Sequence, residues 1–117
     1  MCIFCKIINK ELPSEIVYEN DEVIVIKDLS PITPDHSLVI PKSHAKNMID
    51  IEPVLFMEVM RVSQAVANQH LEENNDIKGY NIIINNNSAA QQAVDHLHTH
   101  IVYRKDANEI NYFSKKD

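Results

Sequence analysis

The residues best suited to chemistry in this chain are three histidines at alternate positions near its C-terminal end, His96, His98 and His100. If residues 94–103 form a strand, successive side chains point to opposite faces, so the three imidazoles share one face. Such a group suits a polar, solvent-facing strand, a metal site, or catalysis by an imidazole that has one N–H held and the other nitrogen free to attack. The triplet alone does not choose between these roles.

Three further residues are candidates for binding or catalysis. Cys2 and Cys5 form a C-x-x-C pair, which in a reducing compartment is more often a metal-binding or redox pair than a structural disulfide. Asp28 ends a strand-like run, where it either starts an Asx-type turn or serves as an acceptor-only ligand group.

Composition excludes several classes of function. The chain has 117 residues, enough for one domain with one hydrophobic core, and its 17 acidic and 11 basic residues give a formal charge of −6. This charge offers no electrostatic footprint for duplex DNA or an anionic membrane, so we expect neither nucleic acid nor membrane as a partner. Because no signal-peptide pattern or long apolar run is present, we expect a cytoplasmic protein.

Hydrophobic patterning predicts the elements that must position these residues. We expect a short helix over residues 3–9 and two strands joined by a polar turn within 15–29. A short β-rich run over 36–42 follows, and two more strands over 80–86 and 94–103 close the chain.

Between these strands, one long amphipathic helix of about six turns is predicted, with Asp50 as its candidate cap and Pro53 in its first turn. Its apolar face is marked by residues spaced four, three and four apart: Leu55, Val59, Val62 and Val66. Five short strands, one long helix and one short helix predict an α+β fold with an antiparallel five-stranded sheet, in one domain that spans residues 1–117.

Several segments together resemble the histidine triad (HIT) family. They are KIINKELP, DLSP, HSLVIPKSH and the H-x-H-x-H triplet followed by Ile101 and Val102, and they extend over nearly the whole chain. The chain looks most like the short branch of histidine triad nucleotide-binding proteins. The resemblance implies a homodimeric hydrolase or transferase. It would cleave nucleoside 5′-phosphoramidates, or related nucleotidyl (AMP-X) compounds of purine nucleotides, through a nucleotidyl-histidine intermediate.

The resemblance also implies roles by position. His98 matches the nucleophile, whose Nε2 attacks the α-phosphorus while its Nδ1–H bonds a backbone carbonyl. His100 matches a residue that contacts the phosphoryl oxygens, His36 a neighbour that assists in proton transfer, and Asp28 the acceptor of both ribose hydroxyls. Polar residues near the scissile phosphate and apolar residues around the base are matched by Asn85, Gln92, Phe4, Leu12, Ile26 and Leu29. The apolar four are equally explained as ordinary core.

A structural zinc site is a further implication of the resemblance. Microbial members with a C-x-x-C pair near the start hold zinc with these two thiolates and two histidines, and the matching residues here are Cys2, Cys5, His44 and His96. Two sulfur and two imidazole ligands make a closed tetrahedral shell. The alternative is that these four residues only pack together.

The loop before the triplet departs from the family pattern. Gln91 stands where the family usually has glycine, which restricts the backbone, and Ala93 replaces a common hydroxyl residue. Thr99 is polar where an apolar residue is usual. These departures bear on substrate range and rate. Three alternatives stay open: a nucleotide-binding interaction module with negligible turnover, a dinucleoside polyphosphate hydrolase, and a metal hydrolase that uses all three triplet histidines.

Overall fold

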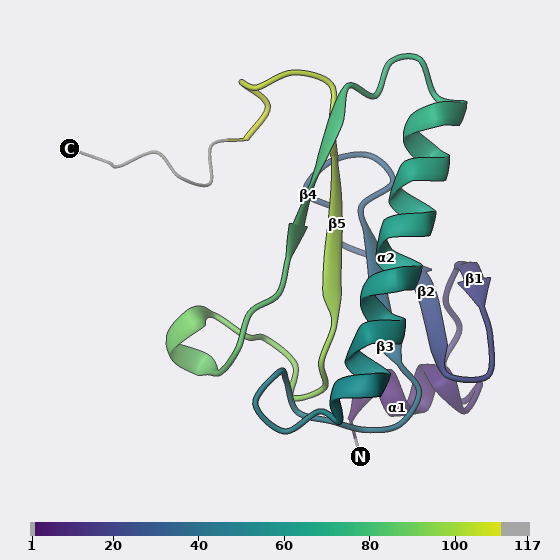
Figure 1. The fold of residues 1–117 in the computed structure, drawn as a ribbon, viewed down its shortest axis with the longest axis vertical. Helices are drawn as coiled ribbons and strands as arrows, with labels where there is room; N and C mark the ends of the chain where they lie inside the picture. Colours follow the sequence, from purple (N-terminus) through teal and green to yellow (C-terminus); the bar gives the residue numbers. More distant parts are fainter. Residues whose placement is uncertain (1, 111–117) are drawn as a thin grey trace.

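The structure of the protein is a computed structural model, and it describes residues 2–110 (Figure 1). Its elements in chain order are α1 (Ile3–Ile8), β1 (Ile16–Glu19), β2 (Val23–Lys27), β3 (Ser37–Pro41), α2 (Pro53–Glu73), β4 (Gly79–Ile83), the 3-10 helix η1 (Ser88–Ala90) and β5 (Thr99–Arg104). In these residues, neither α-helix combines the length and the apolar character that crossing a bilayer requires.

The strands form one five-stranded sheet in the order β1-β2-β3-β5-β4, and every neighbouring pair is antiparallel. The predicted α+β class and antiparallel sheet, with one long and one short helix, are therefore confirmed. The strand β5 lies between β3 and β4, so it places the triplet end of the chain beside the segment that begins at Ser37. Their pairing sets Leu38 opposite His100.

The helix α2 covers one face of the sheet. Its inward residues are Val59, Val62 and Ala67, and they pack on β2, β3 and β5 through a core that includes Val25 and Ile101. Burial of this face is the main force that holds the helix on the sheet.

The start of α2 differs from the prediction. The carboxylate of Glu52, not Asp50, caps the helix by accepting hydrogen bonds from the backbone N–H groups of Val54 and Leu55 at 3.1 and 3.0 Å. Asp50 instead accepts the N–H groups of Lys46 and Asn47, which lie in the preceding turn. Both acidic residues lie within three positions of the first turn, so the sequence pattern alone did not distinguish them.

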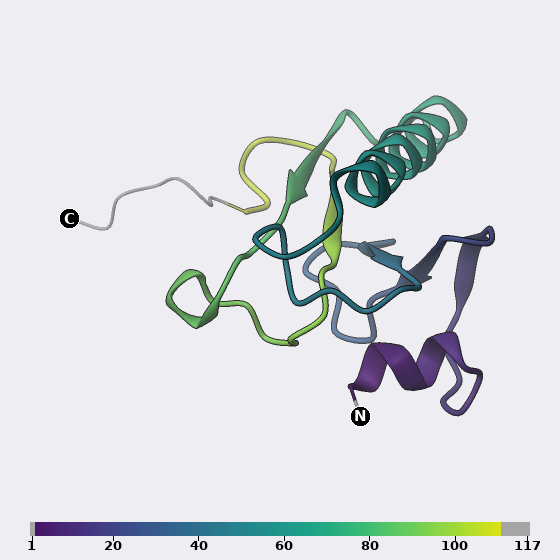
Figure 2. The ribbon, with the colours of Figure 1, turned by 60° about the horizontal axis from the view of Figure 1, so that its bottom comes forward.

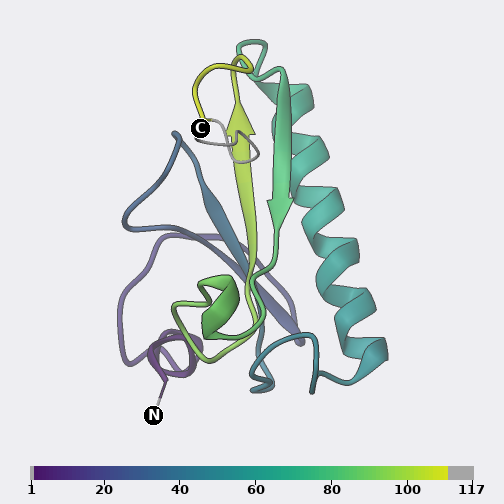
Figure 3. The ribbon, with the colours of Figure 1, turned by 90° about the vertical axis from the view of Figure 1, so that its left-hand side faces the viewer.

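The opposite face of the sheet carries α1 and the loop that contains η1. Figure 2 shows α1 and α2 on opposite sides of the sheet, and Figure 3 shows η1 on the α1 side. A second, smaller core holds α1 in place, and it consists of Phe4, Ile7, Ile24, Ile26, Leu38 and Ile40. Because strand residues alternate between faces, Ile24 and Ile26 serve this core while Val23 and Val25 serve the core under α2.

The predicted strand over residues 94–103 was too long. Only Thr99–Arg104 belongs to β5, and both His96 and His98 precede it. The reason lies in the backbone partners of this segment, since the N–H of Leu97 donates to the carbonyl of Ala45 at 2.8 Å instead of to a neighbouring strand. The three histidines therefore do not form one row on a strand face.

Candidate functional site

His98 is held in one tautomer by its own chain. Its Nδ1 lies 2.8 Å from the carbonyl oxygen of His96, and only an Nδ1–H can donate to that acceptor. The lone pair is therefore on Nε2. The ring is 6% exposed and meets the ring of Phe4 edge-on, with 5.0 Å between centroids. Burial lowers the pKa of His98, although the hydrogen bond to the His96 carbonyl partly offsets this, so the imidazole is neutral at neutral pH.

His36 and His100 form a hydrogen-bonded pair with a defined direction. The backbone N–H of Ile32 donates to Nδ1 of His36 at 3.1 Å, so the proton of neutral His36 is on Nε2. That Nε2 lies 2.9 Å from Nδ1 of His100, which must then accept. The proton of neutral His100 is consequently on its own Nε2. A backbone amide thus determines the tautomer of two successive imidazoles.

Burial keeps this pair uncharged. Burial lowers the pKa of His36, and the charge that His98 would carry lowers it further, against an opposing effect of Asp28. Burial, followed by the neighbouring imidazoles of His98 and His36, lowers the pKa of His100 to about 4. Near pH 7 the pair therefore presents an N–H donor, rather than a positive charge, at the end of the chain of hydrogen bonds.

Asp28 combines the two roles that the sequence left open. Its Oδ1 accepts the backbone N–H of Ser30 at 2.9 Å, which is the Asx-turn geometry. Its Oδ2 lies 3.6 Å from Nε2 of His36, and its own N–H donates to the carbonyl of His36 at 2.9 Å. The carboxylate is therefore oriented by a turn and stands beside the His36–His100 pair.

The loop before the histidines is organised by the buried side chain of Gln92. Its Oε1 accepts the N–H of Asn87 at 2.8 Å and Nδ2 of Asn47 at 3.0 Å, while its Nε2 donates to the carbonyls of Lys46 and Val94. Both amide hydrogens are used inside the protein, so Gln92 holds the loop rather than offering a free donor. The other predicted polar residue, Asn85, is half-buried next to this loop.

Sequence reasoning missed Asn47. This residue is 1% exposed, and its Nδ2 donates both to Gln92 and to Oδ1 of Asn87 at 2.8 Å, while its Oδ1 accepts the N–H of Ile49. Asn47 thus ties the turn after β3 to the loop before the triplet. No periodic pattern marks it, because the partners that give it a role lie about forty residues later in the chain.

The loop also shows what the missing glycine does. Gln91 adopts the left-handed conformation, with φ 67° and ψ 30°, and the preceding Asn87 has φ 74°. Glycine reaches this region without steric cost, whereas glutamine does not. Position 91 therefore has a backbone conformation that favours glycine, and glutamine is less suited to it.

The apolar residues predicted around a base fall into two groups. Phe4 and Ile26 are buried in the smaller core, where Phe4 also contacts the rings of His96 and His98. Leu12 is 38% exposed and Leu29 is 87% exposed. Phe4 and Ile26 are therefore core residues, whereas the two leucines lie at the surface.

A second group of side chains, Cys2, Cys5, His44 and His96, forms next to the first. Nδ1 of His96 lies 3.3 Å from Sγ of Cys2 and 3.6 Å from Sγ of Cys5, and Nδ1 of His44 lies 3.3 Å from Sγ of Cys5. All four donor atoms are within 4.8 Å of one another.

The chemistry of this group fits a zinc ion. Nε2 of His96 is 2.7 Å from the carbonyl of Pro41, to which it must donate, so the unprotonated Nδ1 faces the two sulfurs. Metal-bound histidines are usually oriented by such a hydrogen bond from their second nitrogen. Two thiolates and two imidazoles are the donor set of a closed structural zinc site, so the group is compatible with zinc.

The cluster of Asp28, His36 and His100 is different, although its donor atoms are equally close. Nδ1 of His36 accepts the N–H of Ile32, so a metal on Nε2 would require the ring to lose this bond or to ionise. The three triplet histidines also do not converge on one point. His96 faces the cysteines, His98 bonds a backbone carbonyl, and His100 faces His36.

The chain resembles known proteins along most of its length. A family model described as the HIT domain matches residues 9–107. A HIT-like protein of Borreliella burgdorferi is 41% identical over 88% of this chain and 75% of its own length. The adenosine 5′-monophosphoramidase of Candida albicans is 37% identical over 90% of this chain and 71% of its own length. The crystal structure of a zinc-bound histidine triad family protein from Mycobacterium smegmatis superimposes with a TM-score of 0.90 at 34% identity, covering 99% of this chain and 84% of that one.

Proposed function

Because this chain belongs to the HIT family, as its sequence motifs indicated, we propose that it is a nucleotide hydrolase that cleaves nucleoside 5′-phosphoramidates or related nucleotidyl compounds through a nucleotidyl-His98 intermediate. One observation carries the proposal. The hydrogen bond from Nδ1 of His98 to the His96 carbonyl leaves the lone pair of a neutral imidazole on Nε2, as a nucleophile requires.

The proposed reaction has two steps. In the first, the Nε2 lone pair of His98 attacks the α-phosphorus, the bond from phosphorus to the leaving nitrogen breaks, and the amine departs after taking up a proton. In the second, water attacks the same phosphorus and gives up a proton, which replaces the one that the amine took up. The bond from phosphorus to Nε2 breaks, and the nucleoside monophosphate leaves with neutral His98 restored. The His96 carbonyl stabilises the positive charge that the ring carries between the two steps.

His100 and His36 serve the phosphoryl group. The Nε2–H of His100 is the donor at the end of the Ile32–His36–His100 chain, and it hydrogen-bonds a phosphoryl oxygen as negative charge builds there. His36 assists the proton transfer to the leaving amine by holding His100 in this orientation. The direction of the hydrogen bonds, fixed by a backbone amide, supports this assignment.

The nucleoside occupies the side next to Asp28. Its Oδ2, which is not used in the Asx turn, accepts the ribose hydroxyls. A purine base packs between Phe4, Ile26, Leu12 and Leu29. Asn85 contacts the phosphate. Gln92 supports the loop before the histidines through its four hydrogen bonds.

The four-residue group of Cys2, Cys5, His44 and His96 holds a structural zinc ion in this proposal. Bound zinc supplies a cross-link between the start of α1, the turn after β3 and the segment before His98. Its support is the donor set and the orientation of His96 by Pro41.

We further propose that the protein is a homodimer through β4 and the adjoining side of α2. The strand β4 is an edge of the sheet and is half-buried along its whole length. Beside it, Phe56, Met57, Met60, Tyr80 and Ile82 line an apolar groove, and Met57 is 68% exposed. A second copy pairing at this edge would cover both the open strand and the groove.

A substrate panel tests the proposed activity. The purified protein is incubated with adenosine and guanosine 5′-phosphoramidates, acyl-adenylates and dinucleoside polyphosphates, and the quenched reaction is analysed for a nucleotidyl adduct on His98 by peptide mass spectrometry. Cleavage of phosphoramidates with the adduct supports the proposal. Cleavage of long polyphosphates alone moves the assignment to a dinucleoside polyphosphate hydrolase. Nucleotide binding without any turnover or adduct overturns the enzyme and leaves an interaction module.

A further inference from the structure

We propose that Asp35 is a positioning residue that holds His36, and through it His100, from the α2 side of the sheet, with His70 as its anchor. The kinetic consequence rests on the proposed function, whereas the structural one does not. His70 and Asp35 take no part in the site described above, yet Asp35 directly precedes His36 in the chain.

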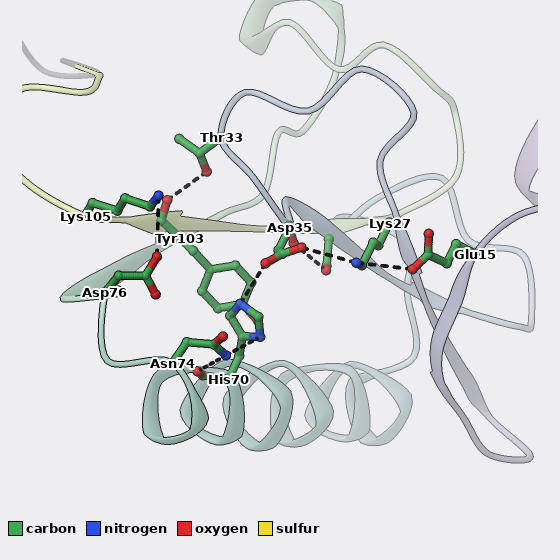
Figure 4. A network of polar contacts seen from close by, with 10 residues as sticks. Glu15, Lys27, Thr33, Asp35, His70, Asn74, Asp76, Tyr103 and Lys105 are labelled. Carbon is green, nitrogen blue, oxygen red and sulfur yellow. Dashed lines mark hydrogen bonds and ion pairs between the residues drawn. The ribbon is translucent and has the colours of Figure 1, made fainter.

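The carboxylate of Asp35 contacts side chains from two elements, β2 and α2, as Figure 4 shows. Its Oδ1 lies 3.2 Å from Nζ of Lys27, at the end of β2, and that amine also contacts Glu15 at 3.2 Å. Its Oδ2 lies 3.2 Å from Nε2 of His70 on α2, which is ion-pair distance without the geometry of a hydrogen bond. The side chain therefore links the long helix to the turn before β3.

The ring of His70 is itself oriented. Nδ2 of Asn74 is 3.2 Å from Nδ1 of His70 and 2.9 Å from the His70 carbonyl, so Nδ1 accepts and the ring proton of the neutral form is on Nε2. The ring also packs on the buried ring of Tyr103, with 4.2 Å between centroids. An N–H group thus faces Asp35 whether His70 is neutral or protonated.

The backbone conformation of Asp35 explains why the contacts of its carboxylate matter. This residue has φ 67°, in the left-handed region that costs a non-glycine residue on the order of 1 kcal/mol. Lys27 and Asp35 each have 39% of their side chain exposed, so their ion pair adds little stability by itself. We infer that these contacts, together with the hydrogen bond from the Ser37 hydroxyl to the Asp35 carbonyl at 2.9 Å, favour the left-handed backbone of this residue.

The turn connects the backbone of Asp35 to the hydrogen-bonded pair of His36 and His100. The N–H of His36 donates to the Thr33 carbonyl at 3.2 Å, and the Thr33 hydroxyl donates to the Tyr103 carbonyl at 2.7 Å. The same turn presents the N–H of Ile32 to Nδ1 of His36. A change in the Asp35 backbone therefore shifts the hydrogen bond that sets the tautomers of His36 and His100.

One substitution at Asp35 and one at His70 remove the two sides of their contact. Asp35→Gly accepts the left-handed conformation without strain but removes the carboxylate that contacts Lys27 and His70. His70→Phe keeps the packing on Tyr103 but removes the Nε2–H that faces Asp35. We expect each to lower kcat for phosphoramidate cleavage about tenfold with KM unchanged, and the double variant to be no slower than either single one. His70→Gln, which retains an N–H donor, should recover most of the rate. Glu73 lines the same 260 Å³ pocket as Asp35 and His70, so Glu73→Gln is the matched control and should behave as wild type.

A wild-type kcat in Asp35→Gly, or losses that multiply in the double variant, would overturn the proposal. The ring ¹⁵N chemical shifts of His36 and His100 give a readout that needs no turnover. In the wild-type protein they should report Nε2–H tautomers for both rings, and in Asp35→Gly and His70→Phe they should move towards a tautomer mixture. Unchanged shifts in both variants would refute the positioning role even if the protein proved to have no hydrolase activity.

Discussion

The carbonyl oxygen of His96 lies 2.8 Å from Nδ1 of His98, while the ring of His96 points away towards Cys2. One residue therefore contributes to both groups of side chains. Its backbone orients the proposed nucleophile, and its ring is a donor in the cysteine and histidine cluster. Two histidines two positions apart thus have different surroundings.

Replacing His98 tests the nucleophile. We expect His98→Asn to abolish turnover while nucleotide binding persists, since a carboxamide cannot form the bond to phosphorus but retains polar contacts. Turnover is measured with an adenosine 5′-phosphoramidate, and binding is measured by calorimetry with AMP. A variant that keeps more than a few per cent of the wild-type kcat would rule out His98 as the nucleophile.

The ribose contact of Asp28 is tested on the ligand side. A nucleotide that lacks both ribose hydroxyls should bind more weakly by about 1–3 kcal/mol, because Oδ2 of Asp28 would be left desolvated and unpaired. The comparison is made by calorimetry with AMP and its 2′,3′-dideoxy analogue. With Asp28→Ala the difference between the two sugars should disappear. Equal affinities in the wild-type protein would remove Asp28 from the ribose site.

The zinc proposal predicts a metal-dependent stability. Thiolates and neutral imidazoles are the ligands, and the unfolded chain has no preformed site, so the binding energy of the ion should appear as stability. A chelator should therefore lower the melting temperature of the wild-type protein. Cys5→Ser should have a lower melting temperature and respond little to the chelator. Native mass spectrometry of protein purified with added zinc and reduced thiols gives the stoichiometry, and a metal-free wild-type mass would show that the four residues only pack.

The buried pair of His36 and His100 predicts how stability depends on pH. The pKa of His100 is lowered from 6.5 to about 4, so between these values the unfolded chain takes up a proton that the folded one does not. This contribution to stability is present above pH 6.5 and is lost as the pH falls towards 4, by about 3 kcal/mol for this residue.

Urea unfolding at a series of pH values checks this expectation. The free energy of unfolding should fall more steeply between pH 6.5 and 4 in the wild-type protein than in His100→Gln, which has no group to titrate at that position. The metal content is held constant by adding chelator to both proteins. Identical slopes would mean that folding does not suppress the protonation of His100.

The sequence by itself determined the elements and the family. The run of β-branched apolar residues over 23–26 and the four-three-four spacing of Leu55, Val59, Val62 and Val66 are local signals of strand and helix, and both elements formed. The Asx turn at Asp28 is equally local, since its acceptor and donor are two residues apart. Such features follow from neighbours in the chain, which a sequence displays directly.

Only the tertiary structure decided how the three histidines divide their tasks. Their spacing predicted one shared strand face, but the Leu97 N–H bonds the carbonyl of Ala45, and β5 starts at Thr99. The ring of His96 consequently meets Cys2, 94 residues away, and the tautomer of His100 depends on the Ile32 amide through His36. A hydrogen-bond partner supplied by a distant segment leaves no periodic mark on the sequence, so these roles became visible only once the sheet had brought the segments together.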